Sequence, residues 1–202
     1  MEQKQHVQIV VADPTALGLF GLAIVTFVAA SQKLAWTTGI SFIIPWAVFL
    51  GSVAQLMACV YDFKHNNIFG ATVFGAYGLF WIGVASCLLI KLGAFGPQLA
   101  ASVDIQQLGF AYFGYFIFSL FATVAATAAH KVLLTIMILI DVLLLCLSLD
   151  AWGVGGHLPH SVAAWSEFAI ALLSFYGSGA TFLNKFFNRP LLPLGKGLQL
   201  FK

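Results

Sequence analysis

The chain has 202 residues, of which 61% are hydrophobic and only 8% are charged, and its formal net charge is +2. Soluble domains carry about a quarter charged residues, so this composition excludes a soluble globular protein and predicts one that lies in lipid. A bilayer core about 30 Å thick takes about 20 apolar residues per helix. The length therefore leaves no room for a large second domain.

Six apolar segments follow one another along the chain, separated by charged or Gly- and Pro-rich stretches. Each is long enough to cross a bilayer as a helix. They are residues 15–32, 40–61, 68–90, 108–129, 132–149 and 161–183. We therefore expect an all-α integral membrane protein with six transmembrane helices. We also expect one domain over residues 1–202, with polar tails at about 1–13 and 188–202.

The first segment has a helix start at Asp13 and Pro14. An Asp side chain can accept hydrogen bonds from the free amides of a first turn, and Pro suits the first helical position.

Lysine and arginine residues give the orientation of the helices. With six spans, most of them gather on one side, which holds Lys4, Lys64, Lys131, Lys185, Arg189, Lys196 and Lys202. The other side collects only Lys33 and Lys91. Because basic residues are enriched in cytoplasmic loops, both termini are expected to face the cytoplasm.

The second segment carries a stripe of small or polar residues at helical spacing. Its members are Gly51, Ser52, Gln55, Cys59 and Asp62. Such a stripe faces either another helix or a water-filled path, and the sequence leaves both interpretations open.

Two acidic residues fall inside predicted spans. Asp141 lies near the middle of the fifth, and an ionised carboxylate there costs about 2.5–3.5 kcal/mol on insertion scales. Glu167 lies a short way into the last span. Each is expected either to form a hydrogen bond between helices or subunits, or to serve a proton or solute path.

No enzyme signature is present: there is no His pair inside a span, no G-x-S-x-G and no phosphate-binding loop. The three cysteines show no ligand spacing. We expect no catalytic residues, no metal, no cofactor and no nucleic-acid partner.

A family likeness follows from motifs spread over the chain. D-P-T-A-L-G-L, with Asp13, Pro14, Gly18 and Leu19, resembles the N-P-A-P-L-G-L that opens the acetate uptake transporter (AceTr/YaaH) family. The match continues through four collinear motifs, which are residues 51–55 (G-G-x-A-Q), 62–70 with Asn67 and Gly70 (E-[YF]-K-x-x-N-x-F-G), 77–81 (Y-G-x-F-W) and 192–195 (L-P-x-G).

The resemblance implies a multi-pass protein of the cell inner membrane that assembles as a homo-hexamer. Each protomer would carry its own path for acetate and other small monocarboxylates, with succinate and proton coupling as open points. A narrow constriction is implied at Leu22, Tyr77 and Ile140. Counted from the starts of their spans, these three side chains reach a similar depth near the midplane, so they can form a ring.

A carboxylate crossing the membrane needs its charge compensated. The helix starts at 13–15 and 67–70 would offer free amides and positive dipole ends. Polar groups expected along the path, besides Tyr77, are Thr26, Gln55, Thr72 and Trp81.

This chain departs from the family pattern in four places. Asp13 stands for Asn, Leu22 stands for Phe in the familiar permease, and two acids, Asp141 and Glu167, replace neutral residues. Our hypothesis is that Asp141 is protonated when an anion passes. Two other functions stay open: a channel for a small neutral solute such as urea or ammonia, and a membrane protein with a structural or sensing role.

Overall fold

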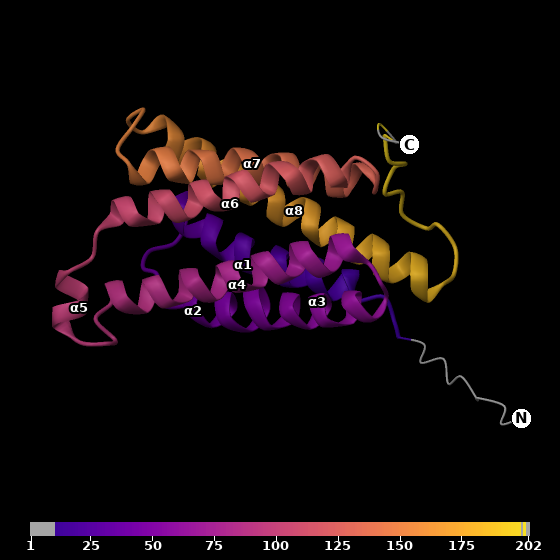
Figure 1. The fold of residues 1–202 in the computed structure, drawn as a ribbon, viewed down its shortest axis with the longest axis horizontal. Helices are drawn as coiled ribbons and strands as arrows, with labels where there is room; N and C mark the ends of the chain where they lie inside the picture. The colour runs from indigo at the N-terminus through magenta and orange to yellow at the C-terminus, as the bar shows by residue number, and fades with distance from the viewer. Residues whose placement is uncertain (1–10, 199, 201–202) are drawn as a thin grey trace, which may run out of the picture.

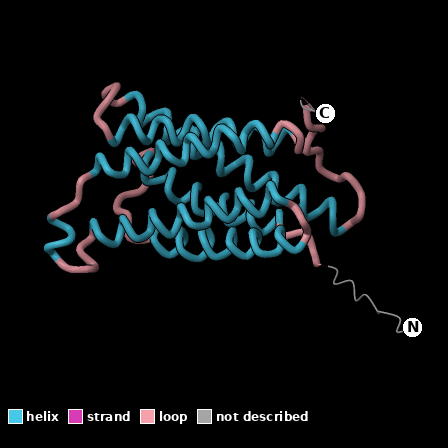
Figure 2. The backbone as a smooth tube through the Cα atoms, viewed as in Figure 1, coloured by secondary structure: helices cyan, strands magenta, loops and turns pink. Residues whose placement is uncertain are grey.

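The computed structural model describes residues 11–198 and 200. Within them every regular element is helical, as Figures 1 and 2 show. Lys4 and Lys202, counted above for orientation, lie outside the described residues, as do parts of both predicted tails.

The elements follow the predicted apolar segments closely. In order they are α1 (Thr15–Lys33), α2 (Ile43–Trp46), the π-helical η1 (Ala47–Ala54), α3 (Gln55–Lys64), α4 (Ile68–Lys91), α5 (Pro97–Ala101), α6 (Ile105–Ala126), α7 (Lys131–Ala151) and α8 (Leu158–Phe186). α2, η1 and α3 form one continuous rod, which begins and ends three residues later than predicted. The long connection at 91–107 contains a short helix, α5, where a loop was expected.

Five of these rods are long and apolar enough to cross a membrane, and they are Thr15–Lys33, Ile43–Lys64, Ile68–Lys91, Ile105–Ala126 and Lys131–Ala151. The sixth predicted span lies within α8, which is helical over 29 residues but is not one of the five. Glu167 and the small polar residues of its second half lower its hydropathy.

Those small residues let α8 lie closely along α1. Ser178 Oγ donates a hydrogen bond to the Ala16 carbonyl oxygen over 2.7 Å. A Cβ added at Gly177 would lie 3.2 Å from Leu19 Cδ1, which leaves little space between the two helices. Some of the small and polar residues of α8 therefore face α1.

The rods run alternately up and down, and α1 packs on α8, α6 on α7, α7 on α8 and α3 on α4. The described parts of both termini lie at the same end of the bundle (Figure 1). We call this the Thr15 end, and the opposite end, where α1 finishes and α5 lies, the Lys33 end.

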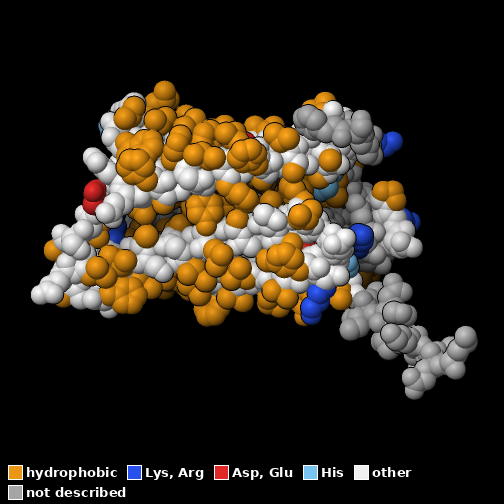
Figure 3. Space-filling model, viewed as in Figure 1, with side chains coloured by type: hydrophobic (Ala, Val, Ile, Leu, Met, Phe, Trp, Pro, Cys, Tyr) orange, Lys and Arg blue, Asp and Glu red, His pale blue; other side chains and the backbone are white. Residues whose placement is uncertain are grey.

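Apolar side chains cover the flank of the bundle that Figure 3 shows, and charged side chains gather near its two ends. Two phenylalanines of α6, Phe121 and Phe110, add to the apolar surface, since they are 74% and 70% exposed. The bundle therefore has the surface that a bilayer requires.

The stripe on the second rod is buried. Its members, Gly51, Ser52, Gln55, Cys59 and Asp62, all belong to the buried part of the chain. Gly51 lies directly against the indole of Trp81, so a Cβ there would come within 2.7 Å of Trp81 Cγ. Most of the stripe thus serves helix packing, and of the stripe residues Gln55 lines one of the three cavities described below.

The L-P-L-G segment after α8 returns to the α6–α7 turn. The Val132 amide donates to the Leu194 carbonyl oxygen at 3.2 Å, and the Leu198 amide donates to the Thr127 carbonyl oxygen at 2.7 Å. Gly195 has a φ of +77°, a backbone conformation that favours glycine, and it lies against the Lys131 side chain.

Candidate functional site

Three cavities lie in a row through the single chain. A vestibule of about 570 Å³ occupies the Lys33 end. An upper cavity of about 50 Å³ follows it, and a lower cavity of about 40 Å³ lies nearer the Thr15 end. The vestibule and the upper cavity share the lining residues Lys33, Trp81, Val84, Tyr112 and Leu147.

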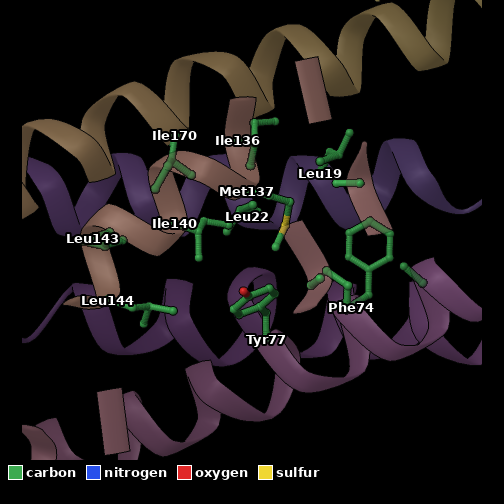
Figure 4. Close-up of a cluster of buried hydrophobic side chains, with 14 of the residues drawn as sticks. Leu19, Leu22, Phe74, Tyr77, Ile136, Met137, Ile140, Leu143, Leu144 and Ile170 are labelled. Atoms are coloured by element: carbon green, nitrogen blue, oxygen red, sulfur yellow. The ribbon is translucent and has the colours of Figure 1, made fainter. Parts of the chain in front are cut away.

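The upper and lower cavities share three lining residues, Leu22, Tyr77 and Ile140. They come from α1, α4 and α7, and their side chains point toward one another in Figure 4. All three are buried, with exposures of 8%, 5% and 5%. These are the residues predicted to form the constriction, and we call them the ring.

Residues of α6 fix the position of the Tyr77 side chain. Its hydroxyl donates to Ser119 Oγ over 2.9 Å, and its aromatic ring stacks on Tyr115 with centroids 6.3 Å apart. Because the Tyr77 hydroxyl already donates to Ser119 inside the bundle, the ring of three residues presents a mostly apolar surface to the cavities.

An ion pair lines the upper cavity on its Lys33 side. Lys33 Nζ lies 2.8 Å from Glu167 Oε2, and the side chains are 22% and 2% exposed. Glu167 was predicted as a polar site, and the structure places it on a cavity wall with a partner from α1.

The backbone near Lys33 is fixed by α7 and α8. His160 Nε2 lies 3.3 Å from the Lys33 carbonyl oxygen, and His160 Nδ1 lies 3.1 Å from Asp150 Oδ2. These contacts join the ends of three helices beside the vestibule.

The structure places the residues predicted along the path in different locations. Thr26 and Trp81 line the upper cavity, although the Thr26 hydroxyl already donates to Leu22 O at 2.7 Å. Gln55 lines the lower cavity, and its buried Nε2 has no hydrogen-bond partner among the described residues. Thr72 is exposed and lines none of these three cavities. The rotation of α4 buries its neighbours Ala71 and Val73 instead, so we leave Thr72 out of the path.

Asp141 lies between α6 and α7. Its Oδ2 accepts a hydrogen bond from Thr123 Oγ1 at 2.7 Å, while its buried Oδ1 has no partner among the described residues. Asp141 does not line the vestibule, the upper cavity or the lower cavity.

The start of α4 forms part of the lower cavity. Asn67 caps the helix, with Oδ1 accepting from the Gly70 amide at 3.2 Å, and its Nδ2 donates to Asp62 Oδ1 at 2.9 Å. The other oxygen of Asp62 presses against the Cα of Gly70, where no side chain would fit. The Gly70 amide is therefore occupied and not free, contrary to the expectation from sequence.

At the start of α1 the predicted hydrogen bond to the Asp13 side chain is present, so an amide there is also occupied. The helix begins at Thr15 with Pro14 as its N-cap, one residue later than expected, and Asp13 Oδ1 accepts from the Thr15 amide at 2.9 Å. Burial alone would raise the pKa of the Asp13 carboxyl, but the hydrogen bonds from Thr15 and the nearby Lys185 ammonium outweigh it. The pKa therefore lies below its ordinary value of 3.8.

Sequence reasoning missed Lys33 as a site residue and counted it only as a basic residue at a span end. The signal available was a lysine at the end of the first predicted span and a glutamate a short way into the last span from the same side. Their separation of 134 residues in the chain concealed the pairing.

Comparisons with known proteins agree with this architecture. The model of the GPR1/FUN34/yaaH family matches residues 2–196. The succinate-acetate/proton symporter SatP of Escherichia coli (strain K12) is 28% identical over 187 residues, which covers 92% of this chain and 96% of that protein. Acetate permease A of Emericella nidulans is 31% identical over 134 residues, covering 60% of this chain and 44% of that protein. The solved structure of the bacterial acetate channel SatP superimposes with a TM-score of 0.84 at 27% identity, covering 92% of this chain and 100% of that one.

Proposed function

Because this chain belongs to the GPR1/FUN34/yaaH family, we propose that it is a multi-pass membrane protein that carries acetate and other small monocarboxylates through each single chain. Two relatives are named for acetate, and the superimposed structure is an acetate channel. The observation that carries the proposal is the row of three cavities within one chain, two of which meet at the ring.

The ring accounts for the size of the solute. Leu22 and Ile140 contribute branched aliphatic side chains, and Tyr77 contributes an aromatic face. Such a waist favours a small body with a methyl group and excludes bulkier acids. Trp81, Thr26 and Gln55 complete the path on its two sides.

The full architecture is part of the same proposal. We take α8 as the sixth span, since it is 29 residues long and lies along α1. Lys64, Lys131, Lys185, Arg189 and Lys196 lie at the Thr15 end, and this excess of basic residues supports an orientation with that end and both termini in the cytoplasm. The chain would then be one transmembrane domain, residues 1–202, assembling as a hexamer in the inner membrane.

Uptake of labelled acetate into proteoliposomes, with and without a pH gradient, tests this function. We expect uptake that formate inhibits strongly and urea does not. Faster uptake with the gradient would indicate coupled proton movement, and equal rates would indicate a channel. Strong competition by urea would favour a channel for neutral solutes. Vesicles that take up neither acetate nor urea would favour a structural or sensing protein.

A further inference from the structure

The ion pair of Lys33 and Glu167 lies on the wall of the upper cavity, between the vestibule and the ring. We propose that Lys33 is a binding site for the carboxylate of the passing solute, and that Glu167 competes with the solute for this lysine. The inference deepens the proposed function and rests on it.

Lys33 has donors to offer. A lysine ammonium carries three N–H donors, and among the described residues Nζ makes one hydrogen bond, to Glu167. Lys33 lines both the vestibule and the upper cavity, so a solute that moves from one to the other passes its side chain.

The position of the ammonium is fixed rather than free. Glu167 is buried to 2% exposure and draws Nζ toward the cavity, and His160 contacts the backbone oxygen of Lys33. The other vestibule lysine, Lys91, is exposed. Lys33 is therefore the cation placed to neutralise an anion just before the ring.

Glu167 gives the site its reversibility. A partly buried lysine without a counter-ion would hold a carboxylate tightly and slow its release, whereas conduction requires binding weak enough to let the solute leave. A fixed carboxylate beside the same ammonium weakens the attraction for a second carboxylate. When the solute departs, Nζ returns to Glu167 alone.

The test measures acetate affinity at equilibrium on the purified full-length protein, together with acetate uptake in proteoliposomes. Replacing Glu167→Gln removes the competitor and is expected to tighten acetate binding about tenfold, while lowering the maximal uptake rate. Replacing Lys33→Gln is expected to weaken binding about tenfold, the effect of one hydrogen bond to a charged group. The double variant, which leaves no unpaired buried charge, is expected to bind as weakly as Lys33→Gln.

Acetamide serves as the uncharged probe of the same shape, and its binding should be the same in all of these proteins. Lys64→Gln, which removes an exposed lysine at the other end of the bundle, is the control for net charge and should bind acetate as the unchanged protein does.

The opposite directions of the two single variants distinguish this site from a structural pair. Weaker or unchanged acetate binding in Glu167→Gln would overturn the inference, and so would wild-type affinity in the double variant. The proposed function is judged separately. If acetate affinities across the variants follow this pattern but the unchanged protein takes up no acetate, the transport function is refuted and the binding site is retained.

Discussion

Tyr77 on α4 and Ser119 on α6 are joined by a hydrogen bond of 2.9 Å, and both residues are buried, with exposures of 5% and 0%. This bond fixes Tyr77, the aromatic member of the ring, through a residue that lines none of the three cavities. α6 thus influences the ring although it contributes no residue to it.

The first prediction concerns this bond. Ser119→Ala leaves the Tyr77 hydroxyl buried without a partner, and we expect a loss of about 1–3 kcal/mol in the free energy of unfolding. The double variant Tyr77→Phe with Ser119→Ala removes both partners and should lose less than Ser119→Ala alone. Unfolding of the detergent-solubilised proteins checks both values, and a double variant that is less stable than the single one would contradict this account.

The second prediction concerns the width of the waist. Leu22→Ala and Ile140→Ala shorten ring side chains, so we expect uptake of propionate and butyrate to rise relative to acetate. Competition between the three labelled acids in proteoliposomes measures this ratio. Ile138→Ala makes a matched control, because Ile138 lies on α7 and is 46% exposed. An unchanged ratio in both ring variants would mean that selection occurs elsewhere.

The third prediction concerns Asp141. Its hydrogen bond to Thr123 joins α6 to α7, and it lines none of the three cavities. We therefore expect Asp141→Asn to leave acetate uptake and its pH dependence unchanged, since Asn still accepts from the Thr123 hydroxyl. Loss of the pH dependence would instead give Asp141 the proton role that our sequence hypothesis assigned to it. A smaller assembly with normal uptake per chain would place it at a subunit interface.

The fourth prediction concerns Gly70. The Asp62 carboxylate lies against its Cα, so Gly70→Ala must displace either a buried acid or the start of α4. We expect a loss of more than about 2 kcal/mol, in the range of overpacked sites. Gly83→Ala on the same helix meets nothing within 4 Å and should not lower stability. Thermal unfolding compares the two variants, and equal effects would exclude the packing explanation.

The fifth prediction concerns pH and His130. Its Nδ1 accepts from the Leu133 amide at 3.1 Å at the start of α7, so the folded protein needs this nitrogen unprotonated. Burial lowers the pKa of His130 from its ordinary value of 6.5. The unfolded chain therefore binds the proton more readily, and stability should fall as the pH drops below about 6.5 toward the folded pKa.

His130→Asn tests this explanation, because Asn caps a helix without titrating in that range. We expect a smaller decrease in melting temperature between pH 7.5 and pH 5.5 in this variant than in the unchanged protein. An equal decrease would assign the pH dependence to other groups.

The sequence predicts the helices well, because apolar runs of this length have one stable form in lipid. It predicts the ring less directly: the motifs supply the residues, and the rise per residue places them at one depth. That three side chains also face one another depends on the rotation of α1, α4 and α7, which composition does not determine. Thr72 was misassigned for the same reason.

The pairing of Lys33 with Glu167 depends on how α8 lies along α1. No pattern within either segment specifies that contact, and a lysine at a span end is ordinarily a headgroup anchor. Likewise, the amides at the start of α4 were expected to be free because the sequence does not show that Asn67 occupies one of them. Asp13 accepts a hydrogen bond from a first-turn amide, as predicted from the sequence.

The ring takes its three side chains from α1, α4 and α7 of one chain, and two cavities of that chain meet there. If copies assemble as proposed, each is expected to conduct by itself, as one of several parallel conductors. If inactive copies are mixed with active ones, the total rate should fall in simple proportion to their share, with no dominant effect of a single inactive member.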